Sequence, residues 1–92
     1  MQKMAGALRA RTDEILAANQ LDMEAGRKNG LSNALLDRLL LTESRVEDMA
    51  QGLEALISLP DPVGKIDSMW TRPNGLQIGK MRVPLGVVGM IY

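Results

Sequence analysis

The chain has 92 residues, enough for one small domain or for part of a larger one. Its 11 basic and 11 acidic residues cancel, and its apolar runs are too short to span a membrane, so neither a nucleic-acid nor a membrane partner is expected. The absence of Cys and His excludes disulfides, thiolate nucleophiles, imidazole bases and the usual zinc ligands, and we expect no metal site.

Two helices are predicted within the first thirty residues, over 1–20 and 21–27. The second should end at Asn29 and Gly30, which are typical of helix C-termini. Apolar residues recur in the first helix at gaps of three, four and seven, a spacing that predicts one face against a core. They are Met1, Met4, Ala5, Leu8, Ile15 and Leu16.

Ser32 and Thr42 are predicted to cap two further helices. A side-chain oxygen at such a position accepts a hydrogen bond from the first turn. The helix after Thr42 has the clearest amphipathic pattern of the chain, and Pro60 should end it because the residue before a proline leaves the helical region. Its apolar positions are Val46, Met49, Ala50, Leu53, Leu56 and Ile57.

An extended region follows the prolines of the linker 60–65. Asn74-Gly75 is a strong hairpin signal, which we assign to a turn whose two central residues both have positive φ. Leu76 and Ile78 share one face, whereas Met81 lies on the other, and a bulge at Gly79 would explain the change. The pattern predicts a hairpin over 66–83.

The last residues, "RVPLGVVGMIY", are typical of a strand buried on both faces of a parallel sheet. Such a strand requires neighbours. Gly86 and Gly89 lie inside the apolar run rather than at a helix start, so they favour close backbone packing over a phosphate-binding loop.

No constellation of side chains points to catalysis. The carboxylate pairs Asp13-Glu14 and Glu47-Asp48 are neighbours in sequence, so they do not face one another on a helix and are interpreted as surface residues. The methionines at positions 1, 4 and 49 have core spacing, which favours a core over a methionine-rich binding groove. Spacing alone therefore assigns no chemistry.

Four segments together resemble the N-terminal part of the gamma-glutamyl phosphate reductase (glutamate-5-semialdehyde dehydrogenase) family, within the aldehyde dehydrogenase superfamily. They are "LLLT", "LPDPVG", "WTRPNGL" and "VPLGVVGMIY". The resemblance implies an α/β parent protein with a Rossmann-like NADP-binding domain. It assigns 1–59 to the helical N-terminal segment of that domain, 60–65 to a linker, 66–83 to an oligomerisation-type hairpin, and 84–92 to the truncated first strand.

The resemblance also implies an activity for the parent protein. Members reduce L-glutamate 5-phosphate to L-glutamate 5-semialdehyde with NADPH in proline biosynthesis, in the cytoplasm, through a cysteine thiolate. That cysteine lies outside this chain, so the chain itself has no catalytic residue and is expected to be inactive. Ile91 and Tyr92 match the strand end near the nicotinamide side of NADP. The implied partners are the rest of the parent chain and, through the hairpin, further copies of it.

One alternative from another class stays open: a stand-alone helical interaction or dimerisation module with a β-hairpin arm. The neutral charge and the lack of catalytic residue types favour it. The apolar strand at 84–92 argues against it, because an unpaired core strand is an aggregation hazard.

Overall fold

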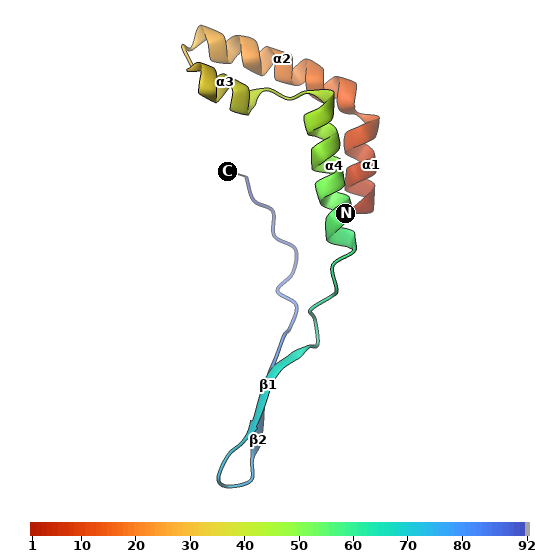
Figure 1. Ribbon diagram of the computed structural model, residues 1–92, viewed down its shortest axis with the longest axis vertical. Coiled ribbons are helices and arrows are strands. Elements are labelled where there is room, and N and C mark those ends of the chain that lie inside the picture. Colours follow the sequence, from red (N-terminus) through yellow and green to blue (C-terminus); the bar gives the residue numbers. More distant parts are fainter. Residues whose placement is uncertain (92) are drawn as a thin grey trace. The chain divides into compact units, whose positions relative to one another are not determined.

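A computed structural model describes residues 1–91 of the chain, which form two compact units (Figure 1). Met1–Leu59 is helical, and the unit from Pro60 onward contains a two-stranded antiparallel hairpin. This order confirms the predicted helices followed by a hairpin. The elements are α1 (Gln2–Ala10), α2 (Thr12–Lys28), α3 (Asn33–Leu39), α4 (Glu43–Ile57), β1 (Ile66–Thr71) and β2 (Gln77–Met81).

The chain turns sharply between α1 and α2 at Arg11, whose φ of −111° and ψ of 21° depart from helical values (Figure 1). The Thr12 hydroxyl donates to the carbonyl oxygens of Leu8 at 2.9 Å and Arg9 at 3.0 Å, so these acceptors are satisfied where the helix bends. The predicted boundary between residues 20 and 21 is therefore wrong, because α2 continues unbroken to Lys28.

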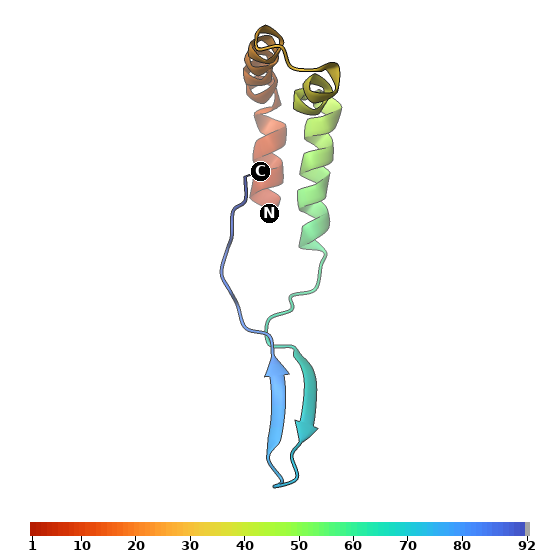
Figure 2. The ribbon, with the colours of Figure 1, turned by 90° about the vertical axis from the view of Figure 1, so that its left-hand side faces the viewer.

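Helices α1 and α4 lie side by side and run in opposite directions (Figures 1 and 2). Ala5, Val46 and Ala50 are buried in the contact, and the two alanines let the helices approach closely. Met1 and Met4 stay more than half exposed, at 56% and 55%. The prediction that these methionines face the core is thus wrong, because α1 turns its small side chain at position 5 toward α4.

Helix α3 packs against α2 at Gly26, where there is no room for a larger side chain. A Cβ atom at this position would lie 3.0 Å from Leu31 Cδ1 and 3.2 Å from Leu36 Cδ2. Met23, three residues earlier and so on a neighbouring part of the same face, is also buried. Glycine is therefore required here for the close approach of α3.

The connection between α3 and α4 is held by Asn19, the one buried polar residue of the described chain. Its amide Nδ2 donates to the Leu39 carbonyl oxygen at 2.8 Å, and its Oδ1 accepts from the Leu41 backbone N–H at 2.9 Å. Both ends of the amide group are used, so burial of this side chain leaves neither its donor nor its acceptor without a partner.

The predicted helix caps are confirmed. The Ser32 hydroxyl oxygen accepts from the Leu35 backbone N–H at 3.3 Å, and Thr42 accepts from Arg45 at 3.2 Å. Helix α4 ends at Ile57, three residues before Pro60, as the proline predicts.

The hairpin contains a bulge, but in β1 rather than at Gly79. Ile66 pairs with Met81 and Ser68 pairs with Lys80, so Asp67 is the extra residue. The predicted bulge at Gly79 is wrong because β2 alternates regularly through that position, opposite Met69. The bulge places the side chains of Ile66 and Met69 on the same face of the hairpin. Both lie close to the point where a Cβ atom at position 79 would be.

The turn has the predicted location but another geometry. Gly75 has a φ of +84°, whereas no residue other than glycine has positive φ among the described residues, so Asn74 does not. The Gly75 N–H donates to the Arg72 carbonyl oxygen at 2.9 Å, which makes Pro73 and Asn74 the central residues. Proline fixes φ near −65°, and this excludes the predicted turn with two positive φ angles at these central positions.

Residues 82–91 have no helix or strand. Pairing continues only as far as Arg82, whose N–H donates to the Lys65 carbonyl oxygen at 2.8 Å. The strand predicted for 84–92 is therefore not formed by the described residues 84–91, because a strand is defined by a hydrogen-bonded neighbour and none is present there. Tyr92, the last residue of that prediction, lies outside the described residues.

Candidate functional site

A cluster of ion pairs joins α1 to α4. Arg9 Nη2 lies 2.7 Å from Glu47 Oε1, and the same guanidinium also pairs with Glu54. These hydrogen bonds lower the pKa of both carboxyl groups and raise the pKa of Arg9. Carboxylates held ionised in this way are poor proton donors, so the cluster serves to join helices rather than to transfer protons.

The remaining carboxylates form no catalytic or metal-binding group. Glu14 pairs with Arg11 on the surface at 2.6 Å, and Asp13 and Asp48 are exposed. Residues 1–91 contain no group of three or more acidic side chains that could hold a metal ion. No helix within the described part of the chain has the length and apolar character needed to cross a membrane.

The residues predicted to approach NADP are not assembled into a site. The Ile91 side chain is fully exposed and lies in a stretch without regular structure, whereas Tyr92 is outside the described residues. A dinucleotide needs a phosphate-binding backbone and a walled pocket, and residues 82–91 supply neither. The described residues alone therefore do not fit this cofactor.

One face of the hairpin presents an apolar cluster, defined by Ile66, Met69 and Met81. All three side chains are more than half exposed. Gly79 lies beneath two of them, since a Cβ atom at this position would lie 3.2 Å from Met69 Cε and 3.7 Å from Ile66 Cγ2. Beside the cluster, Arg82 Nε pairs with the Asp67 carboxylate at 3.0 Å, which ties the bulge to the end of β2.

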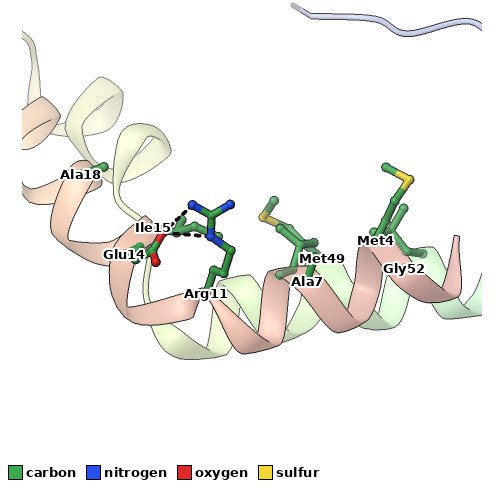
Figure 3. Close-up of a pocket in the computed structure, with 10 residues that line it drawn as sticks. Met4, Ala7, Arg11, Glu14, Ile15, Ala18, Met49 and Gly52 are labelled. Atoms are coloured by element: carbon green, nitrogen blue, oxygen red, sulfur yellow. Dashed lines mark hydrogen bonds and ion pairs between the residues drawn. The ribbon is translucent and has the colours of Figure 1, made fainter.

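A second apolar surface is a groove between α1, the start of α2, and α4 (Figure 3). We call it the α1–α4 groove and define it by Met4, Leu8, Ile15, Met49 and Leu53. The hollow measures about 850 Å³, and Arg11 and Glu14 bring charged side chains to its edge as a mutual ion pair. The apolar spacing of the first helix is the sequence signal for this surface, although the same spacing is equally typical of a core.

The sequence matches gamma-glutamyl phosphate reductases over its whole length. It is 64% identical over 92 residues to the enzyme of Heliobacterium modesticaldum, covering all of this chain and 22% of that protein. It is 66% identical over 89 residues to that of Moorella thermoacetica, covering 97% of this chain and 21% of the relative. The chain thus spans about a fifth of the length of these relatives.

The fold gives the same result. The crystal structure of gamma-glutamyl phosphate reductase from Thermotoga maritima superimposes with a TM-score of 0.78 at 42% identity, over 90% of this chain and 20% of that one. No family model matches the chain. Sequence and fold together confirm the resemblance: the chain is similar to gamma-glutamyl phosphate reductases along its whole length and corresponds to about a fifth of theirs.

Proposed function

We propose that these 92 residues are the N-terminal part of an NADPH-dependent reductase that converts L-glutamate 5-phosphate to L-glutamate 5-semialdehyde in proline biosynthesis. The observation that carries this proposal is the 64% identity, over the whole chain, to a gamma-glutamyl phosphate reductase. Residues 84–92 would then supply the first strand of a Rossmann-like NADP-binding domain, and the protein would act in the cytoplasm.

Within this reductase, the 92 residues act as scaffold and do not carry the chemistry. The family reaction uses a cysteine thiolate, and the chain has no Cys. Its most perturbed ionisable groups, Arg9, Glu47 and Glu54, are occupied in pairing α1 with α4. The thiol, most of the NADP site and the substrate site belong to the rest of the protein.

The hairpin is proposed to join copies of the reductase into an oligomer. Support comes from the apolar cluster of Ile66, Met69 and Met81, which is exposed on one face of β1 and β2. An isolated two-stranded hairpin is at best marginally stable in water, so a further surface against this face would stabilise it.

The test is a comparison of the 92-residue chain with the complete product of its gene. Both are assayed for phosphate-dependent reduction of NADP by glutamate 5-semialdehyde, the reverse of the proposed reaction. We expect turnover by the complete product and no rate above a protein-free control from the 92 residues. Turnover by the short chain would contradict the scaffold role, and a reading frame that stops after Tyr92 would favour the stand-alone module.

A further inference from the structure

The chain contains two Asn-Gly pairs, Asn29-Gly30 and Asn74-Gly75, and both are exposed. They share one backbone geometry. Gly30 and Gly75 have φ angles of +75° and +84°, and the N–H of each donates to the carbonyl oxygen of the residue three positions earlier, at 3.1 Å and 2.9 Å. The two pairs are therefore chemically matched and differ only in the structure around them.

An Asn-Gly pair is prone to spontaneous deamidation, because glycine has no side chain to hinder its backbone nitrogen. This nitrogen loses its proton to a base in the solvent and attacks the carbonyl carbon of the asparagine side chain. The Cγ–Nδ2 bond then breaks, ammonia leaves after taking up a proton from the solvent, and a cyclic succinimide forms. Water opens the ring at either of its carbonyl groups and gives aspartate or isoaspartate, so water is the only co-reactant.

In the hairpin turn, both reacting groups are engaged in hydrogen bonds. The Gly75 N–H donates to the Arg72 carbonyl oxygen at 2.9 Å, and the Asn74 Oδ1 accepts from the Leu76 N–H at 3.1 Å. The first bond keeps the proton on the attacking nitrogen, and the second fixes the side-chain carbonyl group that this nitrogen must reach. Attack therefore requires the turn to open.

The two turns differ in what keeps them closed. After Asn29-Gly30, the Leu31 N–H donates to the Gly26 carbonyl oxygen at 3.1 Å, and the Leu31 side chain packs at Gly26, where α3 approaches α2. The turn at Asn74-Gly75 instead joins two strands in a region, 60–91, that has no buried residue. A two-stranded hairpin of this kind is marginally stable in water, so this turn opens more often than the first.

We propose that Asn74 is a site of spontaneous deamidation, which the closed hairpin turn holds back and each opening of the hairpin permits. The aspartate product keeps a side-chain oxygen that can accept from the Leu76 N–H, so the turn can form again. Isoaspartate leads the backbone through the former side chain, which lengthens the turn and separates the Gly75 N–H from the Arg72 carbonyl oxygen. The reaction thus locks open a hairpin that has stayed open, independently of the proposed reductase activity.

Mass spectrometry at each asparagine tests the proposal. The 92-residue chain and a free peptide of residues 71–78 are kept in mildly alkaline buffer, and deamidation is followed with time. Within the chain, Asn74 should react about five-fold faster than Asn29, yet several-fold more slowly than in the peptide. In the complete gene product, Asn74 should react no faster than in the 92-residue chain, because further contacts oppose opening of the hairpin.

Urea connects the reaction to hairpin opening. Concentrations that change the Trp70 fluorescence but not the circular dichroism of the helices should raise the rate at Asn74 to that of the peptide and leave Asn29 slow. Equal rates at the two asparagines without urea would overturn the proposal, as would a rate at Asn74 that does not follow the Trp70 signal. A rate at Asn74 equal to that of the peptide without urea would also overturn it, because the turn would then give no protection.

The two products give a second measurement. Asn74→Asp reproduces the aspartate product and should keep the NMR contacts between Trp70 and Ile78, which are paired across the hairpin. The isoaspartyl form, separated from the aged chain by chromatography, should lose these contacts while its helical signal stays unchanged. Asn29→Asp, which adds the same charge to the helical unit, is the control and should keep the contacts. Contacts that persist in the isoaspartyl form would overturn the proposed locking of the open hairpin.

Discussion

The helical unit and the hairpin unit satisfy their backbone hydrogen bonds in different ways. Helices α1–α4 close these bonds within each segment and use side-chain caps at Ser32 and Thr42. Each hairpin strand has one neighbour only, and no residue among 60–91 is buried, whereas the helical unit buries several. The backbone of the helices is therefore largely self-sufficient, whereas a two-stranded hairpin without buried residues is at best marginally stable in water.

The largest expected effect is a separation of the two units during unfolding. Trp70, the only tryptophan, lies in β1 and reports on the hairpin, whereas circular dichroism at about 222 nm reports on the helices. In urea, the Trp70 signal should change well before the helical signal, because two strands without a core are marginal in water. Coincident transitions of both probes would contradict the comparison and indicate one cooperative domain.

Asn19→Ala should clearly destabilise the helical unit. It removes both hydrogen bonds that hold the α3–α4 connection and leaves the Leu39 carbonyl and the Leu41 N–H without this partner, at a cost of about 2–3 kcal/mol in unfolding free energy. Urea unfolding followed by the helical circular dichroism signal gives the value. Gln20→Ala, at an exposed position of the same helix, is the control. Equal midpoints for the two variants would show that the buried amide is not needed.

Gly75→Val should weaken the hairpin by about 1–2 kcal/mol, because φ of +84° is strained for a residue with a Cβ atom. The population of the hairpin follows from NMR cross-strand contacts between Trp70 and Ile78, which are paired in the register. Gly89→Val is the matched control, since position 89 has neither positive φ nor a close neighbour. The helical circular dichroism signal should stay constant in both variants. If the contacts between Trp70 and Ile78 are unchanged in Gly75→Val, the turn lies elsewhere.

Features that depend on local chemistry are predictable from the sequence. The caps at Ser32 and Thr42, the end of α4 before Pro60 and the location of the turn at Asn74-Gly75 each follow from one or two residues. The geometry of the turn does not follow from Asn74-Gly75 alone. The central residues are Pro73 and Asn74 rather than Asn74 and Gly75, and the fixed φ of Pro73 suits the first central position.

Features that depend on tertiary contacts are not predictable in this way. Helical spacing identifies apolar positions but does not decide between two apolar faces, so it cannot show that Ala5 rather than Met4 is buried. At the bend at Arg11, the hydroxyl of Thr12 reaches back to two carbonyl groups, a contact that apolar spacing does not reveal. The candidate NADP contact at Ile91 comes from resemblance, and no local signal shows what surrounds it.

The smallest expected effect is a pH dependence confined to the helical unit. Glu47 and Glu54 have a lowered pKa in the folded state, chiefly because Arg9 donates hydrogen bonds to them. Their contribution to stability is therefore complete above the ordinary value of 4.5 and is lost as the pH falls through the lower folded value. Both side chains are partly exposed, so the effect should be small and weakened by salt.

Urea midpoints of the helical signal, measured from about pH 7 to about pH 3, should differ between the parent chain and Glu47→Gln/Glu54→Gln near neutrality and converge in acid. Glu24→Gln, on the exposed surface of α2, is the control, and its urea midpoints should follow those of the parent chain at every pH. If the difference in midpoint between the parent and the double variant stays constant into acid, the ion pairs do not couple α1 to α4.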